Sequence, residues 1–577
     1  MSILYPKMSV FYQANPMLSR SHQACTFTHM MKCALFTMIA AIAGCSENGA
    51  QQRPETGGTI VIVAIQNPGT LFPPQMLSVT ARQISEQIYD YLADVGPDLN
   101  TLSDRGFRPQ LANKWSWSSD SMQISFAINP RARWHDGKPV TARDVAFTFA
   151  LNKNPELASR YESSLGNIDS VTVADSLIAK FWFHRRLPTQ FLDAAAQMLI
   201  LPAHQLEHIR VSALRESPPP PVGSGRFRLH RWNKGESVEL VADTGNYRGR
   251  ARVDRVIWSI VPDFPAALTR VLRGDADVFE GLRPQDLADL ARQPSLRAVV
   301  VPGMDYVFMR FNLRDPSDTT KPHPLFADRQ MRRAITLALN RQTLARNILD
   351  TFAIVPVGPT VRVYPTTDNR ISQLPYDSAR AAAILDSLGW LRGTNGIRAK
   401  NGKALAFNIS IPTNSLNRMR AGVILQDQLK RAGVRVTLEQ LDLSTETERE
   451  RTGAFDAALD VWTMGAFPDG TRDGWSSEGI GPNGVNFGHY SNPDFDTALD
   501  SALKADSTHA RASFSRAYSI INDDAPAVWL YEARKIIAVH RRIRTNVMRP
   551  DAWWFSLADW YIPMGERVLR DRIPPPN

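Results

Sequence analysis

The three cysteines of this chain, Cys25, Cys33 and Cys45, all lie near its N-terminus, and none follows them. The body of the chain therefore has no disulfide framework, cysteine-based zinc site, iron–sulfur cluster or cysteine nucleophile. A large body without cysteine is typical of an exported protein, because a stray thiol mispairs in an oxidising compartment.

At 577 residues the chain is long enough for two or more domains. Its composition, 43% hydrophobic, 21% charged and 9% aromatic, is that of a soluble globular protein with a sizeable core. A small module and a chain dominated by disorder are excluded. The net charge of +10 includes Lys7, Arg20 and Lys32 near the N-terminus, so the charge on the body is mild.

The N-terminal segment has the pattern of an export signal. Lys32 precedes an apolar run over residues 34–43, which is too short to span a bilayer but suits the core of a signal peptide. The run ends in Ile-Ala-Gly before Cys45, which resembles a bacterial lipobox, whose cysteine becomes the lipidated first residue of the mature protein. The alternative is an ordinary cleavage site beside a coincidental cysteine.

We therefore expect residues 1–44 to be a signal peptide, of which residues 1–29 are a misassigned start if translation begins at Met30 or Met31. Residues 45–56 are polar and aperiodic, which predicts a lipidated, flexible tether.

Beyond the tether, strand and helix patterns alternate. Residues 59–65 form a β-branched run typical of a buried strand, and residues 79–92 carry apolar side chains at helical spacing. Thr141 and Asp144 resemble a capping box that begins a helix. The Pro-rich and Gly-rich segment 218–225 predicts a crossing between domains, and a second boundary is expected near residues 301–303. The expected class is mixed α/β.

One segment carries a family signature. Residues 126–147 contain Trp-His-Asp-Gly-Lys-Pro followed by Thr-Ala-Arg-Asp-Val, which closely resembles the signature of the peptide/nickel-type (family 5) solute-binding proteins of ABC importers. Further blocks, including residues 87–92, 223–229, 331–341 and 490–496, resemble that family in its order along nearly the whole chain.

The resemblance implies a two-lobed periplasmic-binding-protein fold of class II, in its large three-domain, peptide-binding form, with a hinged ligand cleft. The expected limits are residues 57–95, 222–302 and 531–577 for the first lobe, residues 96–221 for the subdomain of the first lobe and residues 303–530 for the second lobe. Because the chain crosses between the lobes more than once, closure around a ligand is the expected motion.

The resemblance also implies the function of an extracytoplasmic lipoprotein, anchored to the membrane only by its lipid in the periplasm or at the cell surface. It would capture a small solute, such as an oligopeptide or a metal chelate, and deliver it to the permease and ATPase of an ABC importer. We expect a monomer with no catalytic residues, cofactor or nucleic-acid partner. The ligand must contact both lobes, because only a higher affinity for the closed form shifts the population towards it.

A strand that ends at Trp462 leads into a turn with Gly465, Phe467 and Asp469, which we expect to face the ligand. In peptide-binding relatives, an Asp three residues after this Trp pairs with the ligand's α-ammonium group. Gly465 occupies that place here, which predicts that a free α-amine is not the anchor and favours a metal chelate or another solute. Asp469 could replace the missing carboxylate, and Trp462 could simply belong to the core.

Two other segments are expected at the cleft because they resemble cleft segments of the family. Tyr306 and Phe308 would share one face of a strand that leads to Asn312, and Asn67 and Thr70 follow the first strand. For each, the alternative is a purely structural role.

Two alternative functions stay open. His204, Glu207 and His208 fit the H-x-x-E-H pattern of a zinc hydrolase, although the segment also fits a short structural helix. A ligand sensor or chaperone on the same fold is the second. The basic cluster 540–544 is interpreted as a solvated strand edge rather than a nucleic-acid site, and Walker A and nucleophile-elbow motifs are missing.

Overall fold

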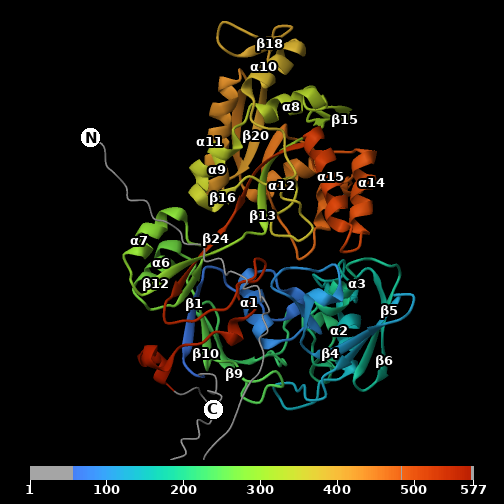
Figure 1. Ribbon diagram of the computed structural model, residues 1–577, viewed down its shortest axis with the longest axis vertical. Coiled ribbons are helices and arrows are strands. Elements are labelled where there is room, and N and C mark those ends of the chain that lie inside the picture. The colour runs from blue at the N-terminus through green and yellow to red at the C-terminus, as the bar shows by residue number, and fades with distance from the viewer. Residues whose placement is uncertain (1–55, 482–483, 574–577) are drawn as a thin grey trace, which may run out of the picture. The chain divides into compact units, whose positions relative to one another are not determined.

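The computed structural model describes residues 56–481 and 484–573 (Figure 1). Cys45, the predicted signal peptide 1–44 and all but the last residue of the predicted tether 45–56 lie outside the described residues. Within the described part, no helix is long and apolar enough to cross a membrane.

The predicted mixed α/β class is confirmed, and the strands gather mainly in three sheets. The first is a seven-stranded sheet, and we call the part of the chain around it the first lobe. Its strands, in spatial order, are β12 (Leu296–Val301), β24 (Lys535–His540), β11 (Val278–Glu280), β1 (Thr59–Ala64), β10 (Arg255–Ile260), β9 (Ser237–Ala242) and β8 (Phe227–Asn233). Its helices are α1 (Val79–Ile88), α6 (Phe264–Leu272) and α7 (Leu287–Ala291).

Strand β1 is the β-branched run recognised in the sequence. It pairs in parallel with β10 and β11, and its side chains are almost entirely buried, as an inner strand requires. Helix α1 ends at Ile88, four residues before the predicted limit. The reason is tertiary: Gly225 N–H donates to the Ile88 carbonyl at 2.7 Å, and a Cβ on Gly223 would lie 1.8 Å from the same oxygen.

The second sheet has four strands and forms what we call the subdomain, with a two-stranded ribbon beside it. The four strands are β4 (Ala112–Trp117), β5 (Gln123–Ile128), β7 (Ile178–Phe183) and β6 (Ile168–Asp175); the ribbon is β2 (Ala93–Val95) and β3 (Phe107–Pro109). The helices are α2 (Ala142–Asn152), α3 (Gln190–Ala195), α4 (Ala203–Leu206) and α5 (Val211–Glu216).

The signature segment joins the subdomain to the first lobe. The predicted capping box forms at α2, where the Asp144 side chain accepts from Thr141 N–H at 2.8 Å. Upstream, the ring of His135 accepts from Gly223 N–H at 3.2 Å through Nδ1 and donates to the Gly225 carbonyl at 2.9 Å through Nε2. Burial lowers the pKa of this imidazole, so it is neutral as the two bonds require. These residues therefore shape the fold, as the sequence predicts.

The third sheet has six strands and, with its helices, forms what we call the second lobe. Its strands are β16 (Ala353–Ile354), β23 (Ala527–Ala533), β13 (Asp305–Phe311), β22 (Ala457–Thr463), β20 (Ala406–Pro412) and β21 (Arg435–Leu441). Short ribbons add β14 (Arg314–Asp315), β15 (Asp318–Pro322), β17 (Leu391–Arg392), β18 (Arg398–Lys400) and β19 (Lys403–Ala404). Its helices are α8 (Arg329–Leu337), α9 (Arg341–Leu349), α10 (Ser378–Ser387), α11 (Leu416–Arg431), α12 (Leu443–Thr452), α13 (Gly470–Trp475), α14 (Pro493–Leu503) and α15 (Ala510–Asp524).

Two short crossings join the seven-stranded and six-stranded sheets. Residues 302–304 lead from β12 to β13, and Arg534 alone lies between β23 and β24. The crossings touch through their backbones, because a Cβ on Gly303 would lie 1.9 Å from the Ala533 carbonyl oxygen. The predicted domain limits stay a prediction, since the chain from residue 54 onward forms one compact unit.

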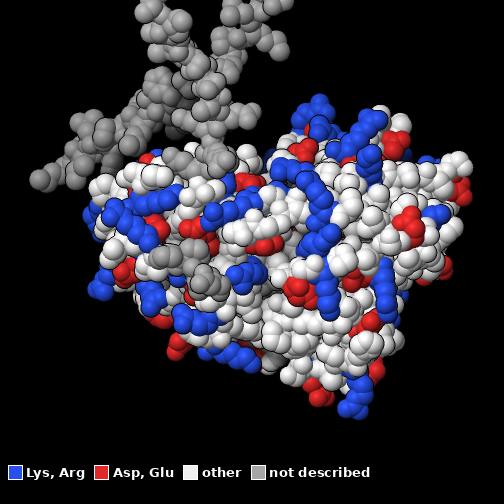
Figure 2. Space-filling model, turned by 90° about the horizontal axis from the view of Figure 1, so that it is seen from below, with Lys and Arg blue, Asp and Glu red and all other residues white. Residues whose placement is uncertain are grey.

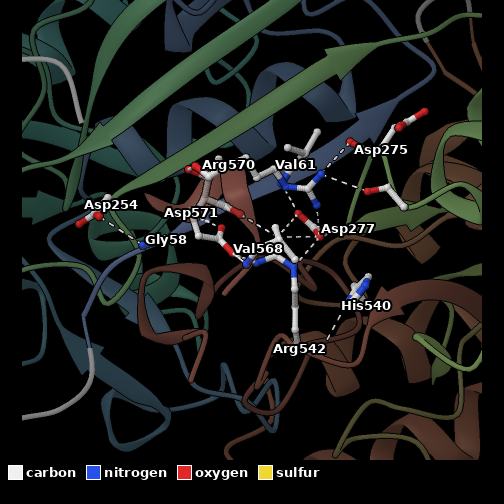
Figure 3. Close-up of polar contacts among 12 residues, drawn as sticks. Gly58, Val61, Asp254, Asp275, Asp277, His540, Arg542, Val568, Arg570 and Asp571 are labelled. Carbon is white, nitrogen blue, oxygen red and sulfur yellow. Dashed lines mark hydrogen bonds and ion pairs between the residues drawn. The ribbon is translucent and has the colours of Figure 1, made fainter. Parts of the chain in front are cut away.

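A buried ion-pair cluster fixes the start of β1 to the C-terminal segment (Figure 3). The guanidinium of Arg542 donates to Asp277 at 2.8 Å and to Asp571 at 2.6 Å, and both carboxylates also accept from backbone N–H groups of β1. The interpretation of residues 540–544 as a solvated strand edge is therefore wrong for Arg542, which is 3% exposed. On the face shown in Figure 2, basic and acidic side chains are interspersed.

Candidate functional site

A cavity of about 420 Å³ lies between the second lobe on one side and the first lobe with its subdomain on the other. The second lobe contributes its predicted ligand loop, whose cavity-lining residues are Thr463, Met464, Gly465, Ala466, Phe467 and Asp469. The opposite wall comes from α1, the β2 strand, the subdomain and the C-terminal segment, with charged residues Arg82, Asp94, Arg160, Arg549 and Asp551. Both lobes therefore build this site.

The ligand loop is held in place by hydrogen bonds from both sides. The Tyr364 hydroxyl donates to the Gly465 carbonyl, and the Thr101 hydroxyl, which belongs to the subdomain, donates to the Ala466 carbonyl at 3.4 Å. Phe467 is buried, with its ring centroid 6.2 Å from that of Phe514. The Thr101 bond joins the two walls of the cavity directly.

Asp469 provides a carboxylate at the cavity. Its side chain accepts from Gly470 N–H at 2.9 Å at the start of α13. The side chain is open to water, yet protein surrounds it on most sides, and this desolvation raises its pKa. Among the described residues it forms no ion pair, so a ligand cation would be its first cationic partner.

A second carboxylate, Asp193 on α3 of the subdomain, lies close enough to Asp469 for their charges to interact. Burial, with the negative charge of Asp469, raises the pKa of Asp193 to about 8. Its hydrogen-bond partners are neutral: the Thr189 hydroxyl donates to it at 3.1 Å, and Gln197, which lines the cavity, is the other. Asp469 therefore lines the cavity, whereas Asp193 is buried beside the lining residue Leu192 and is affected by the charge of Asp469.

Carboxylates balance the positive charges of the arginines on the opposite wall, with one exception. Arg549 pairs with Asp94 at 3.1 Å and with Asp551 at 2.6 Å, and Arg82 pairs with Glu86 at 2.7 Å. Arg160 instead donates to the backbone carbonyl of Met76 at 2.7 Å. Within the described chain Arg160 is therefore the cavity's arginine with no carboxylate partner.

Lys535 connects this wall to the hinge. It is the first residue of β24, directly after the crossing residue Arg534, and it lines the cavity. Its ammonium group lies 3.3 Å from Glu280, which also accepts from the indole N–H of Trp553 at 2.7 Å. A cation of the site therefore lies at the point where the lobes are joined.

The other residues predicted at the site lie elsewhere. Trp462 is half buried, and its indole packs against Gly470 and Gly474 of α13 rather than lining the cavity. Tyr306 and Phe308 do share one face of β13, with ring centroids 5.4 Å apart, but that face is core and both are fully buried.

Asn312 is also fully buried, and its amide donates to the carbonyls of Gly453 and Phe455, each at 2.9 Å. Asn67 and Thr70 close turns after β1 by accepting from Gly69 N–H and Phe72 N–H. Neither turn residue lines the cavity between the lobes. Ligand contacts by these three stay a prediction.

The zinc-like segment does not form a metal centre among the described residues. Helix α4 has only four residues, and the two histidines of the segment contact different carboxylates: His204 contacts Asp136, and His208 lies 3.5 Å from Glu207. His204 bonds to Asp136 of the signature turn at 2.7 Å, Glu207 pairs with Arg143 at 2.5 Å, and His208 is exposed. Through His204, the segment attaches helix α4 to the signature turn.

Sequence reasoning missed the wall opposite the ligand loop. Arg82, Arg160 and Arg549 are far apart in the sequence, and no local spacing links them to one site. A signal in the sequence was that Arg549 and Asp551 directly precede the aromatic run of residues 553–555, which predicts a charged pair beside buried rings.

Comparison with known proteins agrees with the geometry. Residues 106–480 match the family described as bacterial extracellular solute-binding proteins, family 5. The chain is 25% identical over 549 residues to the oligopeptide-binding protein AppA of Bacillus subtilis (strain 168), covering 92% of this chain and 97% of that protein. It is 25% identical over 501 residues to the probable D,D-dipeptide-binding periplasmic protein DdpA of Escherichia coli (strain K12), covering 85% and 92%.

Among solved structures, NikZ from Campylobacter jejuni in complex with Ni(L-His) superposes with a TM-score of 0.71 at 22% identity, covering 87% of this chain and 99% of that chain. At this identity the likeness shows the fold. The predicted two-lobed solute-binding fold is confirmed.

Proposed function

This chain belongs to the bacterial extracellular solute-binding proteins of family 5, and on that premise we propose that it captures a peptide-like or other small solute between its lobes and delivers it to an ABC importer permease. The resemblance seen in the signature segment is thereby confirmed. The family consists of solute-binding proteins, so binding rather than catalysis is the proposed activity, and the zinc-hydrolase alternative is not favoured.

The observation that carries the proposal is a cavity with walls from both lobes. A solute that contacts both walls binds the closed arrangement more tightly than the open one, which is the condition for shifting the population towards closure. Its volume of about 420 Å³ is that of a small-molecule site. This size favours a solute of dipeptide dimensions.

The charges of the cavity favour a zwitterionic solute. Asp469, which lines the cavity, and Asp193, buried beside the lining residue Leu192, repel each other when both are ionised, and a cationic group near them relieves that repulsion. Arg160 offers a guanidinium to an anionic group. The prediction that a free α-amine is not the anchor rests on Gly465 alone. The position of Asp469 in the same cavity instead favours a solute whose free α-amine pairs with this carboxylate.

In this account Tyr306, Phe308 and Asn312 shape the second lobe, and Trp462 braces α13. The protein acts as a monomer and is held at the membrane by a lipid on Cys45. Transport requires separate permease and ATPase subunits.

Native mass spectrometry of freshly purified protein tests the proposal by identifying a co-purified solute. We expect a small molecule with both a cationic and an anionic group, lost on partial unfolding. Protein that carries only a solute without any cationic group would contradict the assignment of Asp469 and Asp193.

A further inference from the structure

A second cavity lies against the hinge and shares no lining residue with the cavity between the lobes. Its volume is about 410 Å³. Both crossings contribute to it, through Pro302 and Gly303 on one and Ala533 and Arg534 on the other. Any molecule in this cavity would touch both connections between the lobes.

Most of the lining is apolar. Val300 is on β12, Pro302 is on the first crossing, and Ile354 and Val363 come from the second lobe beside it. This surface suits a hydrocarbon body and offers few partners to a sugar or another polyhydroxylated molecule.

One buried polar group in this lining is only partly satisfied. Glu532 on β23 is 4% exposed. Its Oε2 accepts from Arg362 N–H at 3.0 Å, but its Oε1 has no hydrogen-bond partner among the described residues. The nearest cation to Oε1 is Arg362 Nε, at 3.8 Å, beyond hydrogen-bond range. A buried acceptor left unpaired is costly, so this oxygen indicates a missing partner.

The charged groups around Glu532 indicate whether the missing partner belongs to a cationic or an anionic ligand. Arg362 directs its guanidinium to the Val355 carbonyl at 2.8 Å, and Arg534 is exposed, lines the cavity and forms no ion pair in the described chain. A ligand cation would be repelled by both guanidinium groups. A ligand anion would pair with Arg534 and accept a hydrogen bond from protonated Glu532.

We propose that this hinge cavity is a second binding site, for a small monocarboxylic acid with an apolar body. The carboxylate lies between Arg534 and the carboxyl of Glu532, and the hydrocarbon lies on Val300, Pro302, Ile354 and Val363. Burial raises the pKa of Glu532 to about 7, against the opposing effects of Arg362 and Arg534. Glu532 can therefore donate to the ligand below neutral pH, and binding weakens as the pH rises through 7. This inference does not depend on the identity of the transported solute.

Octanoate is a suitable probe, with octylamine and octanol as matched probes of the same chain length. Titration calorimetry on the full chain should show one saturable octanoate site at pH 6 and at least tenfold weaker binding at pH 8. Arg534→Met should weaken binding at pH 6 at least tenfold, whereas Arg346→Met, an exposed arginine outside this lining, should not. Glu532→Gln keeps a hydrogen-bond donor at every pH and should remove the difference between pH 6 and pH 8.

Several results would overturn the proposal. One is the absence of saturable octanoate binding at pH 6. Others are binding of octylamine or octanol as tight as that of octanoate, or octanoate binding that Arg534→Met leaves unchanged. Because Arg534 is exposed, its replacement tests the site even if Glu532→Gln fails to fold.

Discussion

Burial, together with the negative charge of Asp469 on the second lobe, raises the pKa of Asp193 on the subdomain, beside the cavity that both lobes line. In the absence of a cation, this closeness is unfavourable whenever both groups are ionised. A solute cation would convert it into an attraction that joins the two walls. We propose that this relationship links recognition of the solute to lobe closure.

The buried acid Asp193 predicts a pH-dependent stability. Its folded pKa of about 8 lies above the ordinary value of 3.8, so the folded state holds a proton that the unfolded state releases. The free energy of unfolding should fall by up to about 1.4 kcal/mol per pH unit as the pH rises towards 8. Urea unfolding at pH 5, 7 and 9 measures this. Asp193→Asn should flatten the profile, whereas exposed Asp169→Asn should leave it as in the wild type.

The contact between the crossings predicts that Gly303 tolerates no side chain. A Cβ there would lie 1.9 Å from the Ala533 carbonyl oxygen, so Gly303→Ala should lower the free energy of unfolding by about 1–3 kcal/mol through overpacking. Gly565→Ala is the control, because a Cβ at Gly565 meets no atom within 4 Å. Equal stability of the two variants in thermal unfolding would show that the crossings do not pack as described.

The cluster in Figure 3 predicts a large effect of removing one cation. Arg542→Met leaves Asp277 and Asp571 buried without their main partner and should destabilise the protein by about 3–5 kcal/mol. Arg544→Met removes an exposed pair with Glu566 and should change stability by less than about 1 kcal/mol. Denaturant unfolding distinguishes them, and a similar small effect of both would contradict the role of the cluster.

Lipidation of Cys45 remains a prediction from the sequence. Metabolic labelling with a fatty-acid probe should label the wild-type protein, and Cys45→Ser should abolish the label and release the protein from the membrane fraction. A Cys45→Ser variant that labels as strongly as the wild type would refute the anchor.

Much of the fold follows from local patterns. The strand β1 and the start of α2 were predictable because burial and capping depend on neighbouring residues. The end of α1 was not, because Gly223 and Gly225 fix it from far along the chain. The alternation of side chains along a strand predicted that Tyr306 and Phe308 share one face of β13. It could not predict that this face belongs to the core.

The candidate site also has one part that local sequence patterns predicted and one part that they did not. Gly465, Phe467 and Asp469 follow a recognisable strand and turn, so the sequence predicted the loop that the structure places at the cavity. The opposite wall is built from α1, α3 and the C-terminal segment, which meet only in the folded chain. No spacing of residues in the sequence predicts such a wall.

Above all, we propose that the cavity binds a solute cation at Asp469, whose charge also acts on the buried acid Asp193 of the subdomain. The most direct measurement equilibrates the protein with a dipeptide library, and separately with the same library after N-acetylation, and counts bound species by native mass spectrometry. We predict that free dipeptides are retained, and that N-acetylation or Asp469→Asn removes most of the bound species, whereas exposed Asp494→Asn does not. Equal retention of acetylated dipeptides, or full retention by Asp469→Asn, would contradict the account.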